Sequence, residues 1–144
     1  MSDQTLKVLR LHPNATLPTR GYSDDAGFDL YTSQAMEVDP GKWVDVPCGI
    51  AVEAPPGVWF RIIGRSSTFR RRRLLVLEGV IDHGYRGELF VGLTNLGEKP
   101  AFIDVGERLA QMIPHYNFPY VIAEFVEELA EHPRGGNGFG STGT

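Results

Sequence analysis

Two segments in the first half of the chain combine glycine with side chains that bind ions. "DDAGFDLY" (Asp24–Tyr31) places three carboxylates within six residues. Carboxylate oxygens bind hard cations directly or through water, and the alternative is a solvated loop with aspartate caps. "GRSST" (Gly64–Thr68) follows an apolar run and offers guanidinium, hydroxyl and backbone N–H donors that suit phosphate oxygens. The equal alternative for this second segment is a capped turn that opens a short helix.

Two further segments carry a candidate general base and a candidate amide donor. "GVIDHGYRGEL" (Gly79–Leu89) places Asp82 after an apolar run, where a carboxylate could activate water, and Tyr85 three residues later could stack on a sugar or base. The alternative is a simple β-hairpin whose turn contains Asp, His and Gly. In "GERLAQMI" (Gly106–Ile113), Gln111 is a lone amide among apolar residues, so it either satisfies the backbone or reaches a ligand.

The fifth segment, "RGGNGFGSTGT" (Arg134–Thr144), ends the chain and has five glycines among eleven residues. Glycine loses the most entropy on ordering, so this run predicts neither a helix nor a central strand. Its backbone N–H groups could wrap phosphates while Arg134 adds charge and Phe139 covers a base. A disordered terminus is the alternative.

Composition narrows the functional classes. The 144 residues suit one domain, and 17 glycines with 10 prolines favour many turns and short strands. A net charge of −4 argues against a stable nucleic-acid partner. The arginine run 70–73 makes no single charged stripe, because on a strand its side chains would point alternately to both faces. The single cysteine, Cys48, excludes an internal disulfide and fits the cytoplasm. No apolar run approaches 18 residues, so we expect no membrane partner. The four histidines show no metal-ligand spacing with Cys48 or one another.

Short strand-like runs separated by turn signals indicate an all-β sandwich, jelly roll or barrel that positions these segments. In "ELFVGLTNL", Leu89, Val91 and Leu93 alternate with polar or small residues and Phe90. "YVIAEFVEELAEH" fits either a helix or a strand, and periodicity leaves both open. The runs predicted as strands cover residues 5–11, 28–31, 43–54, 58–64, 74–81, 88–96 and 101–116, the last divided by a tight turn.

The five segments occur in the order "AGFDLY", "GRSS", "GVIDHGYRG", "GERLAQMI" and "RGGNGFGSTG". This set resembles the five motifs of the homotrimeric deoxyuridine triphosphatases and covers the chain almost end to end. The resemblance implies a jelly-roll-like β-barrel over residues 1–133 and a flexible arm over residues 134–144. It implies a homotrimer whose subunits share active sites, and hydrolysis of dUTP to dUMP and pyrophosphate with Mg²⁺. That activity limits uracil in DNA and supplies dUMP for dTMP synthesis.

The resemblance also implies residue roles. Asp82 corresponds to the base that activates the attacking water, Tyr85 packs under the deoxyribose, and Phe139 lies over the uracil. Asp29 lies near the metal, through water. The other implied substrate-binding residues are Arg65, Ser66, Ser67, Val76, Val80, Ile81, Phe90, Gln111, Arg134, Gly140, Ser141 and Thr142.

Departures from the family pattern keep two alternatives open. "GRSS" replaces the commoner Pro-Arg-Ser-Gly, and the stretch between Arg65 and Asp82 is about two residues short. The second motif and "IDHGY" also resemble deoxycytidine triphosphate deaminases, which share the fold and use a glutamate where this chain has Gly92. Glu88 lies four residues earlier, about 13 Å away along a strand. A non-catalytic nucleotide-binding trimer of the same fold is the other alternative, although Asp82 and Arg134 are both present.

Overall fold

The computed structural model describes residues 4–138, which form short strands and one helix. The prediction of an all-β fold is confirmed, because the single helix spans only seven residues. The elements are β1 (Lys7–Arg10), β2 (Phe28–Tyr31), β3 (Met36–Val38), β4 (Trp43–Pro47), β5 (Ile50–Glu53), β6 (Val58–Gly64), α1 (Ser66–Arg72), β7 (Leu74–Val76), β8 (Gly79–Ile81), β9 (Phe90–Asn95), β10 (Ala101–Ile103) and β11 (Arg108–Tyr116).

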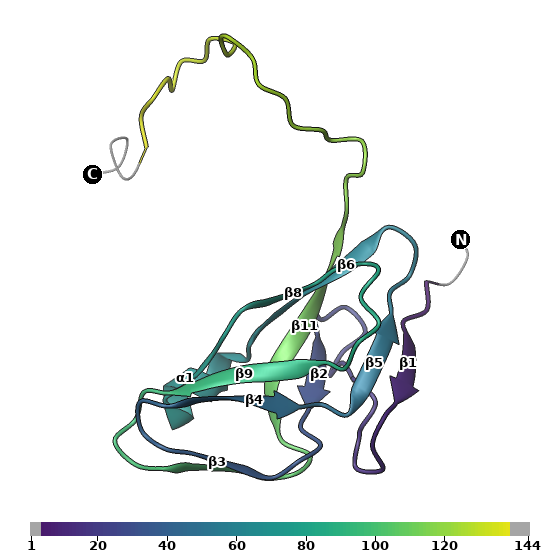
Figure 1. Cartoon of the computed structure of the whole chain (residues 1–144), viewed down its shortest axis with the longest axis vertical. Coiled ribbons are helices and arrows are strands. Elements are labelled where there is room, and N and C mark those ends of the chain that lie inside the picture. Colours follow the sequence, from purple (N-terminus) through teal and green to yellow (C-terminus); the bar gives the residue numbers. More distant parts are fainter. Residues whose placement is uncertain (1–3, 139–144) are drawn as a thin grey trace.

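The described strands pair antiparallel in four sheets around one core. The largest has the order β2-β11-β6-β8, and the second has the order β4-β9-β7. The pairs β1-β5 and β3-β10 complete the set. Figure 1 shows β4 and β9 crossing in front of β11, so the two larger sheets form opposing layers. The core lies between these layers.

Alternation along the strands decides which side chains enter this core. Leu89, Val91 and Leu93 are buried, whereas Phe90 is 45% exposed. This confirms the alternation predicted for β9. In β6, Val58, Phe60 and Ile62 are likewise buried, since residues two apart in a strand share one face. These two strands therefore supply opposite walls of the same apolar interior.

The arginine run is helical, which agrees with the alternative that "GRSST" opens a short helix. Three of its residues end α1, and Arg73 follows in a left-handed conformation with φ 54°. Its backbone N–H donates to the Phe69 carbonyl, which closes the last turn. Thr68 faces inward and is buried, while Arg70 donates from Nη1 to the Ser66 carbonyl four residues earlier. Successive helical residues are about 100° apart, so the arginines fan around the outer sides of α1, where Arg70, Arg71 and Arg73 are exposed and Arg72 is half-buried.

Residues 79–89 do not form the hairpin considered above. β8 pairs with β6, whereas β9 pairs with β4 and β7. The chain therefore leaves one sheet at Ile81 and joins the other at Phe90. We call residues 82–89 the crossing loop. The turn predicted within residues 79–89 is present, but the strands on either side of it pair with other strands and not with each other.

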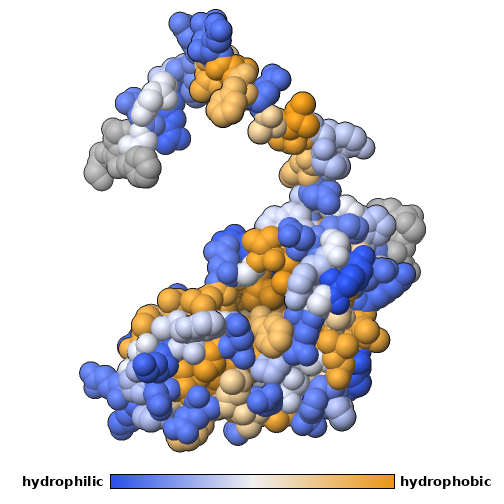
Figure 2. Space-filling view, viewed as in Figure 1, coloured by the Kyte–Doolittle hydropathy of each residue, from blue (hydrophilic) through white to orange (hydrophobic). Residues whose placement is uncertain are grey.

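After β11, residues 117–138 contain neither helix nor strand and extend away from the body (Figure 1). Both alternatives for "YVIAEFVEELAEH" were therefore wrong for this chain. Phe125 is fully exposed and Ile122 is 80% exposed, and apolar side chains are visible along the arm in Figure 2. An isolated helix of this length is marginal in water, and the arm has no surface of its own chain to pack against. None of the described helices has the length and apolar character needed to span a membrane.

Candidate active site

The first, second and fourth motif segments meet around Asp29. β11 lies between β2 and β6, and Gln111 is opposite both Asp29 and Ile63. Arg65 places Nε 3.0 Å from Oδ1 of Asp29, and Arg108 places Nη1 3.6 Å from Oδ2. The Asp29 side chain is only 18% exposed, so these cations compensate a largely buried carboxylate. We call Asp29, Arg65, Ser66, Ser67 and Gln111 the phosphate cluster, after the ligand that the sequence predicts for them.

Arg65 is held by more than this ion pair. Its Nη1 donates to the Arg108 carbonyl at 3.1 Å. Nearby, Oγ1 of Thr68 donates to the Leu109 carbonyl at 2.7 Å, which fixes the start of α1 against β11. The amide of Gln111 donates to the Gly64 carbonyl at 3.3 Å, so it satisfies backbone at the edge of the cluster. The guanidinium of Arg65 is therefore preorganised.

A hollow of about 340 Å³ adjoins the cluster, and its charge is mostly positive. Ser67 is half-buried and lines the hollow, and the neighbouring Ser66 is exposed. Arg72 is neutralised by Glu107 at 2.9 Å. Arg71 makes no ion pair or side-chain hydrogen bond among residues 4–138 and remains available to an anion. The lining residues are Arg65, Ser67, Thr68, Arg71, Arg72, Gly106, Glu107, Arg108 and Leu109.

The crossing loop presents Asp82 and Tyr85 at the other end of β6. Asp82 is exposed, and its carbonyl accepts from the Tyr85 N–H at 3.0 Å. The Tyr85 hydroxyl donates to the Glu88 carbonyl at 2.9 Å. The phenol ring lies over Gly87, where an added Cβ would be 2.5 Å from the Tyr85 hydroxyl oxygen. Glycine is therefore required beneath this ring.

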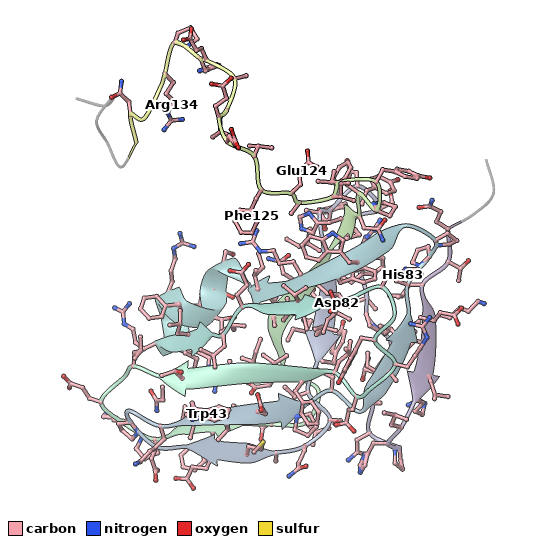
Figure 3. All side chains as sticks on the ribbon, turned by 45° about the horizontal axis from the view of Figure 1, so that its top comes forward. Trp43, Asp82, His83, Glu124, Phe125 and Arg134 are labelled. Atoms are coloured by element: carbon pink, nitrogen blue, oxygen red, sulfur yellow. The ribbon has the colours of Figure 1, made fainter. Side chains whose placement is uncertain are left out.

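The phosphate cluster and the crossing loop are separate within one chain. Ile81 pairs with Phe60, so Asp82 lies beside the start of β6, whereas Arg65 follows its last residue. Six residues of strand separate these positions, a length of about 20 Å. Figure 3 shows Asp82 and His83 at the end of the β6–β8 pair away from α1. No single phosphate group contacts both Asp82 and Arg65 of the same chain.

The remaining expected contacts are dispersed. Val76 packs over Gly64, where an added Cβ would be 3.3 Å from its Cγ2. Val80 is 61% exposed on β8 beside Ile81, which packs against the core. Phe90 lies on the second sheet opposite Pro47.

The expected contacts in the arm lie away from both groups. Figure 3 shows Arg134 far out along the arm, where its Nε donates to the Asn137 carbonyl at 2.7 Å. Phe139, Gly140, Ser141 and Thr142 fall outside the described residues.

Sequence reasoning missed Arg108 and His83. Arg108 lies in the fourth segment, but its contact with Asp29 depends on strand pairing that the local pattern does not specify. His83 was considered only as a turn residue of a possible hairpin, yet its ring bonds to β6. Its position directly after the candidate base was the available signal.

Neither direct metal coordination by Asp29 nor nucleophilic attack by Cys48 fits the structure. Among residues 4–138, no three His, Cys, Asp or Glu side chains converge as metal ligands. Asp29 is a single carboxylate already faced by two arginines, which does not suit direct coordination. Burial, with a smaller effect of the Glu88 charge, raises the pKa of the Cys48 thiol to about 12. Cys48 is therefore a core residue and not a nucleophile.

Comparison with known proteins identifies the family. The dUTPase family model matches residues 13–143, nearly the whole chain. The chain belongs to the dUTPase family. It is 39% identical over 140 residues to the deoxyuridine 5'-triphosphate nucleotidohydrolase of Gloeothece citriformis, covering 96% of each chain. It is 40% identical over 146 residues to that of Mycolicibacterium gilvum, covering 96% of this chain and 95% of the relative.

A solved dUTPase has the same fold. The Staphylococcus bacteriophage 80alpha dUTPase, a G164S mutant with dUpNHpp, superposes with a TM-score of 0.90 at 25% identity. The alignment covers 97% of this chain and 99% of that one. The resemblance read from the five segments is thus confirmed at the level of the family, and the shared dUTPase fold extends over nearly the full chain.

Proposed function

We propose that this protein hydrolyses dUTP to dUMP and pyrophosphate by attack of water on the α-phosphorus. The observation that carries the proposal is the match to the dUTPase family over residues 13–143, a range that contains all five motifs. The phosphate cluster supplies the physical support, because three of the five motif segments converge in it.

The chemistry requires an oriented water and neutralised phosphate charge more than a protein nucleophile. Asp82 is an exposed carboxylate on a turn that is tied to the sheets at both ends, which suits a general base for the water. Arg65 is held in place by Asp29 before any ligand arrives, so its donors need little reorganisation to bind phosphate oxygens. Ser66, Ser67 and Gln111 complete this side, and Arg134 with Ser141 and Thr142 of the arm complete the other.

Magnesium fits this site only as an ion carried by the triphosphate. Mg²⁺ keeps several waters and commonly binds through phosphates and one or two carboxylates. Asp29 would contact such waters, and the metal would neutralise charge on the phosphate oxygens. Chelation with EDTA is expected to lower turnover at least about tenfold without unfolding the protein.

The site is completed by association of subunits into a trimer. Support comes from the distance between Asp82 and Arg65 in one chain, because both must act on the same phosphate. The exposed arm supports the same arrangement, since Ile122 and Phe125 have nothing to pack against in their own chain. The crossing loop of one subunit would face the phosphate cluster of another, and an arm would close over both. The free, buried Cys48 thiol fits a cytoplasmic setting.

Tyr85 and the crossing loop would select the nucleoside. The ring of Tyr85 would pack under the deoxyribose where a 2′-hydroxyl does not fit. Main chain around Val80–Asp82 would read the uracil edge, Val76 and Phe90 would add apolar contact, and Phe139 and Gly140 would cover the ring. Steric exclusion of this kind rejects a larger substrate strongly.

The deaminase alternative is disfavoured at Gly92. An added Cβ there would lie 3.1 Å from Cδ1 of Leu77 and 3.4 Å from Oδ1 of Asp45. A glutamate side chain at this position would meet apolar packing on one side and a carboxylate on the other. The base-directed acid of the deaminases therefore has neither a counterpart nor room at Gly92.

Turnover of dUTP by Asp82→Asn tests the proposal. The variant is expected to bind dUTP yet release pyrophosphate at least about 100-fold more slowly, because an amide cannot accept the proton of water. Asp45→Asn, on β4 in the other sheet, is the matched control and should keep normal turnover. Normal turnover by Asp82→Asn would remove Asp82 from its role. Release of ammonia from dCTP by the unmodified protein would contradict the proposed activity itself.

A further inference from the structure

His83 ties the crossing loop to β6 directly beside Asp82. Its Nδ1 lies 3.0 Å from the carbonyl oxygen of Val58, and the ring is half-buried. A carbonyl oxygen only accepts, so Nδ1 carries the proton in this contact. The bond joins residues 25 positions apart in the sequence, so it fixes where the loop lies and not merely its local shape.

The bond from His83 stands where the pairing of β6 with β8 would otherwise continue. Phe60 is opposite Ile81, Arg61 is opposite Val80, and this register, if continued, would place Asp82 beside Trp59 and His83 beside Val58. The backbone instead turns at Asp82, whose carbonyl accepts from the Tyr85 N–H. The main chain can then no longer pair with Val58. The imidazole of His83 instead donates to the Val58 carbonyl.

Asp82 is consequently held on both sides while its own carboxylate stays free. Ile81 precedes it as the last paired residue of β8, and His83 follows it with the bond to Val58. Among residues 4–138, the Asp82 side chain makes no hydrogen bond or ion pair. The place of the Asp82 backbone, from which the carboxylate projects, is therefore set by its two neighbours and not by a side-chain partner of Asp82.

We infer that His83 is a positioning residue, which aims the Asp82 carboxylate at the attacking water through the Nδ1–H bond to Val58. The inference rests on the proposed function, because it presumes that Asp82 is the base. Small displacements of a catalytic group reduce rates steeply, and a shift of 1 Å costs up to about 100-fold. Nucleotide binding should change little, since the Tyr85 contact with Glu88 and the pairing of Val80 do not depend on His83.

Paired amide substitutions test this inference. His83→Asn places an N–H donor near the position of Nδ1, whereas His83→Gln places it one methylene further out. We expect His83→Gln and His83→Ala to lower kcat for dUTP about tenfold, with KM changed less than about threefold. His83→Asn should recover kcat to within about threefold of the unmodified protein. Binding of the analogue α,β-imido-dUTP, measured by calorimetry on each folded trimer, should be equal in all variants.

Three outcomes overturn the inference. One is a normal kcat in His83→Ala, and another is an equal loss in the Asn and Gln variants. A parallel loss of analogue binding would be the third, because it would make His83 a general support of the loop. Should His83→Ala fail to fold, the comparison of Asn with Gln still decides. Failure of the proposed function is distinguished by the unmodified protein, which would then release no pyrophosphate from dUTP. Failure of Asp82 as the base is distinguished by normal dUTP turnover in Asp82→Asn.

Discussion

Substitution of Gly87 by alanine isolates the contribution of the Tyr85 ring. An added Cβ would lie 2.5 Å from the hydroxyl oxygen of Tyr85 and 2.7 Å from its Cζ, closer than real Cβ contacts permit. Tyr85 is 42% exposed, so the ring has solvent into which it can swing. The displaced ring would lose its bond to the Glu88 carbonyl and its proposed place under the deoxyribose.

The size of the effect follows from these two losses. A net hydrogen bond contributes about 0.5–1.5 kcal/mol, and a side chain pushed about 30° from its rotamer costs about 0.5–1.5 kcal/mol. Together they amount to about 1–3 kcal/mol, or about 5- to 150-fold in kcat/KM for dUTP. Because the ring is the proposed barrier to a 2′-hydroxyl, kcat/KM for UTP should fall less than that for dUTP.

The assay is pyrophosphate release from dUTP and from UTP, each over a range of concentrations. Gly84→Ala is the matched control, because it lies in the same loop and an added Cβ there meets nothing within 4 Å. The control should retain kcat/KM within about twofold. Normal kcat/KM in Gly87→Ala, or an equal loss in both variants, would refute the assignment of Tyr85 to the sugar.

Three other predictions concern charge, the arm and the core. Arg71→Gln should raise KM for dUTP about threefold or more at low salt, and this difference should shrink as added salt screens the charge. Arg70 already donates to the Ser66 carbonyl, so Arg70→Gln is the control and should leave KM unchanged. Equal KM values in both variants would exclude Arg71 from the site. Deletion after Pro133 should leave a folded trimer with at least about 100-fold lower turnover, and normal dUTP hydrolysis by the truncated protein would exclude the arm. Because the pKa of folded Cys48 is raised to about 12 from 9.0, its stabilising effect is complete below pH 9 and is lost as pH rises toward 12. The free energy of unfolding of Cys48→Ala, measured with denaturant, should fall less steeply with pH in this range than that of the unmodified protein. Equal slopes in the two proteins would contradict the prediction.

The sequence predicted local features well because they depend on neighbouring residues. Leu89, Val91 and Leu93 alternate with exposed positions, and that period alone assigns β9 and its buried face. The turn at Asp39–Lys42 is also local: Asp, Pro and Gly favour turns, and the Lys42 N–H donates to the Asp39 carbonyl. The five segments and their order were sufficient to predict the dUTPase family.

Features that depend on distant partners were not predictable from one sequence. The crossing loop looked like a hairpin, since nothing in residues 79–89 reveals that β8 pairs with β6 and β9 with β4. The separation of Asp82 from Arg65 follows from the same pairing. The prediction of a helix or strand in the arm was wrong for a related reason, because the apolar side chains of the arm have no surface of their own chain to pack against. The short helix after "GRSST" was predicted only as an alternative, because a run of like charge has no hydrophobic period.

Complementation between two inactive variants tests most directly the claim that Asp82 of one subunit acts with Arg65 of another. Asp82→Asn and Arg65→Gln, carrying different tags, are co-expressed, and trimers with both tags are purified and their composition is confirmed by native mass spectrometry. In a ring of three, each mixed trimer contains one site with an intact loop and an intact cluster, so about a third of normal activity should return. The parent trimers should each remain at least about 100-fold impaired. Mixed trimers as inactive as their parents would contradict the shared site.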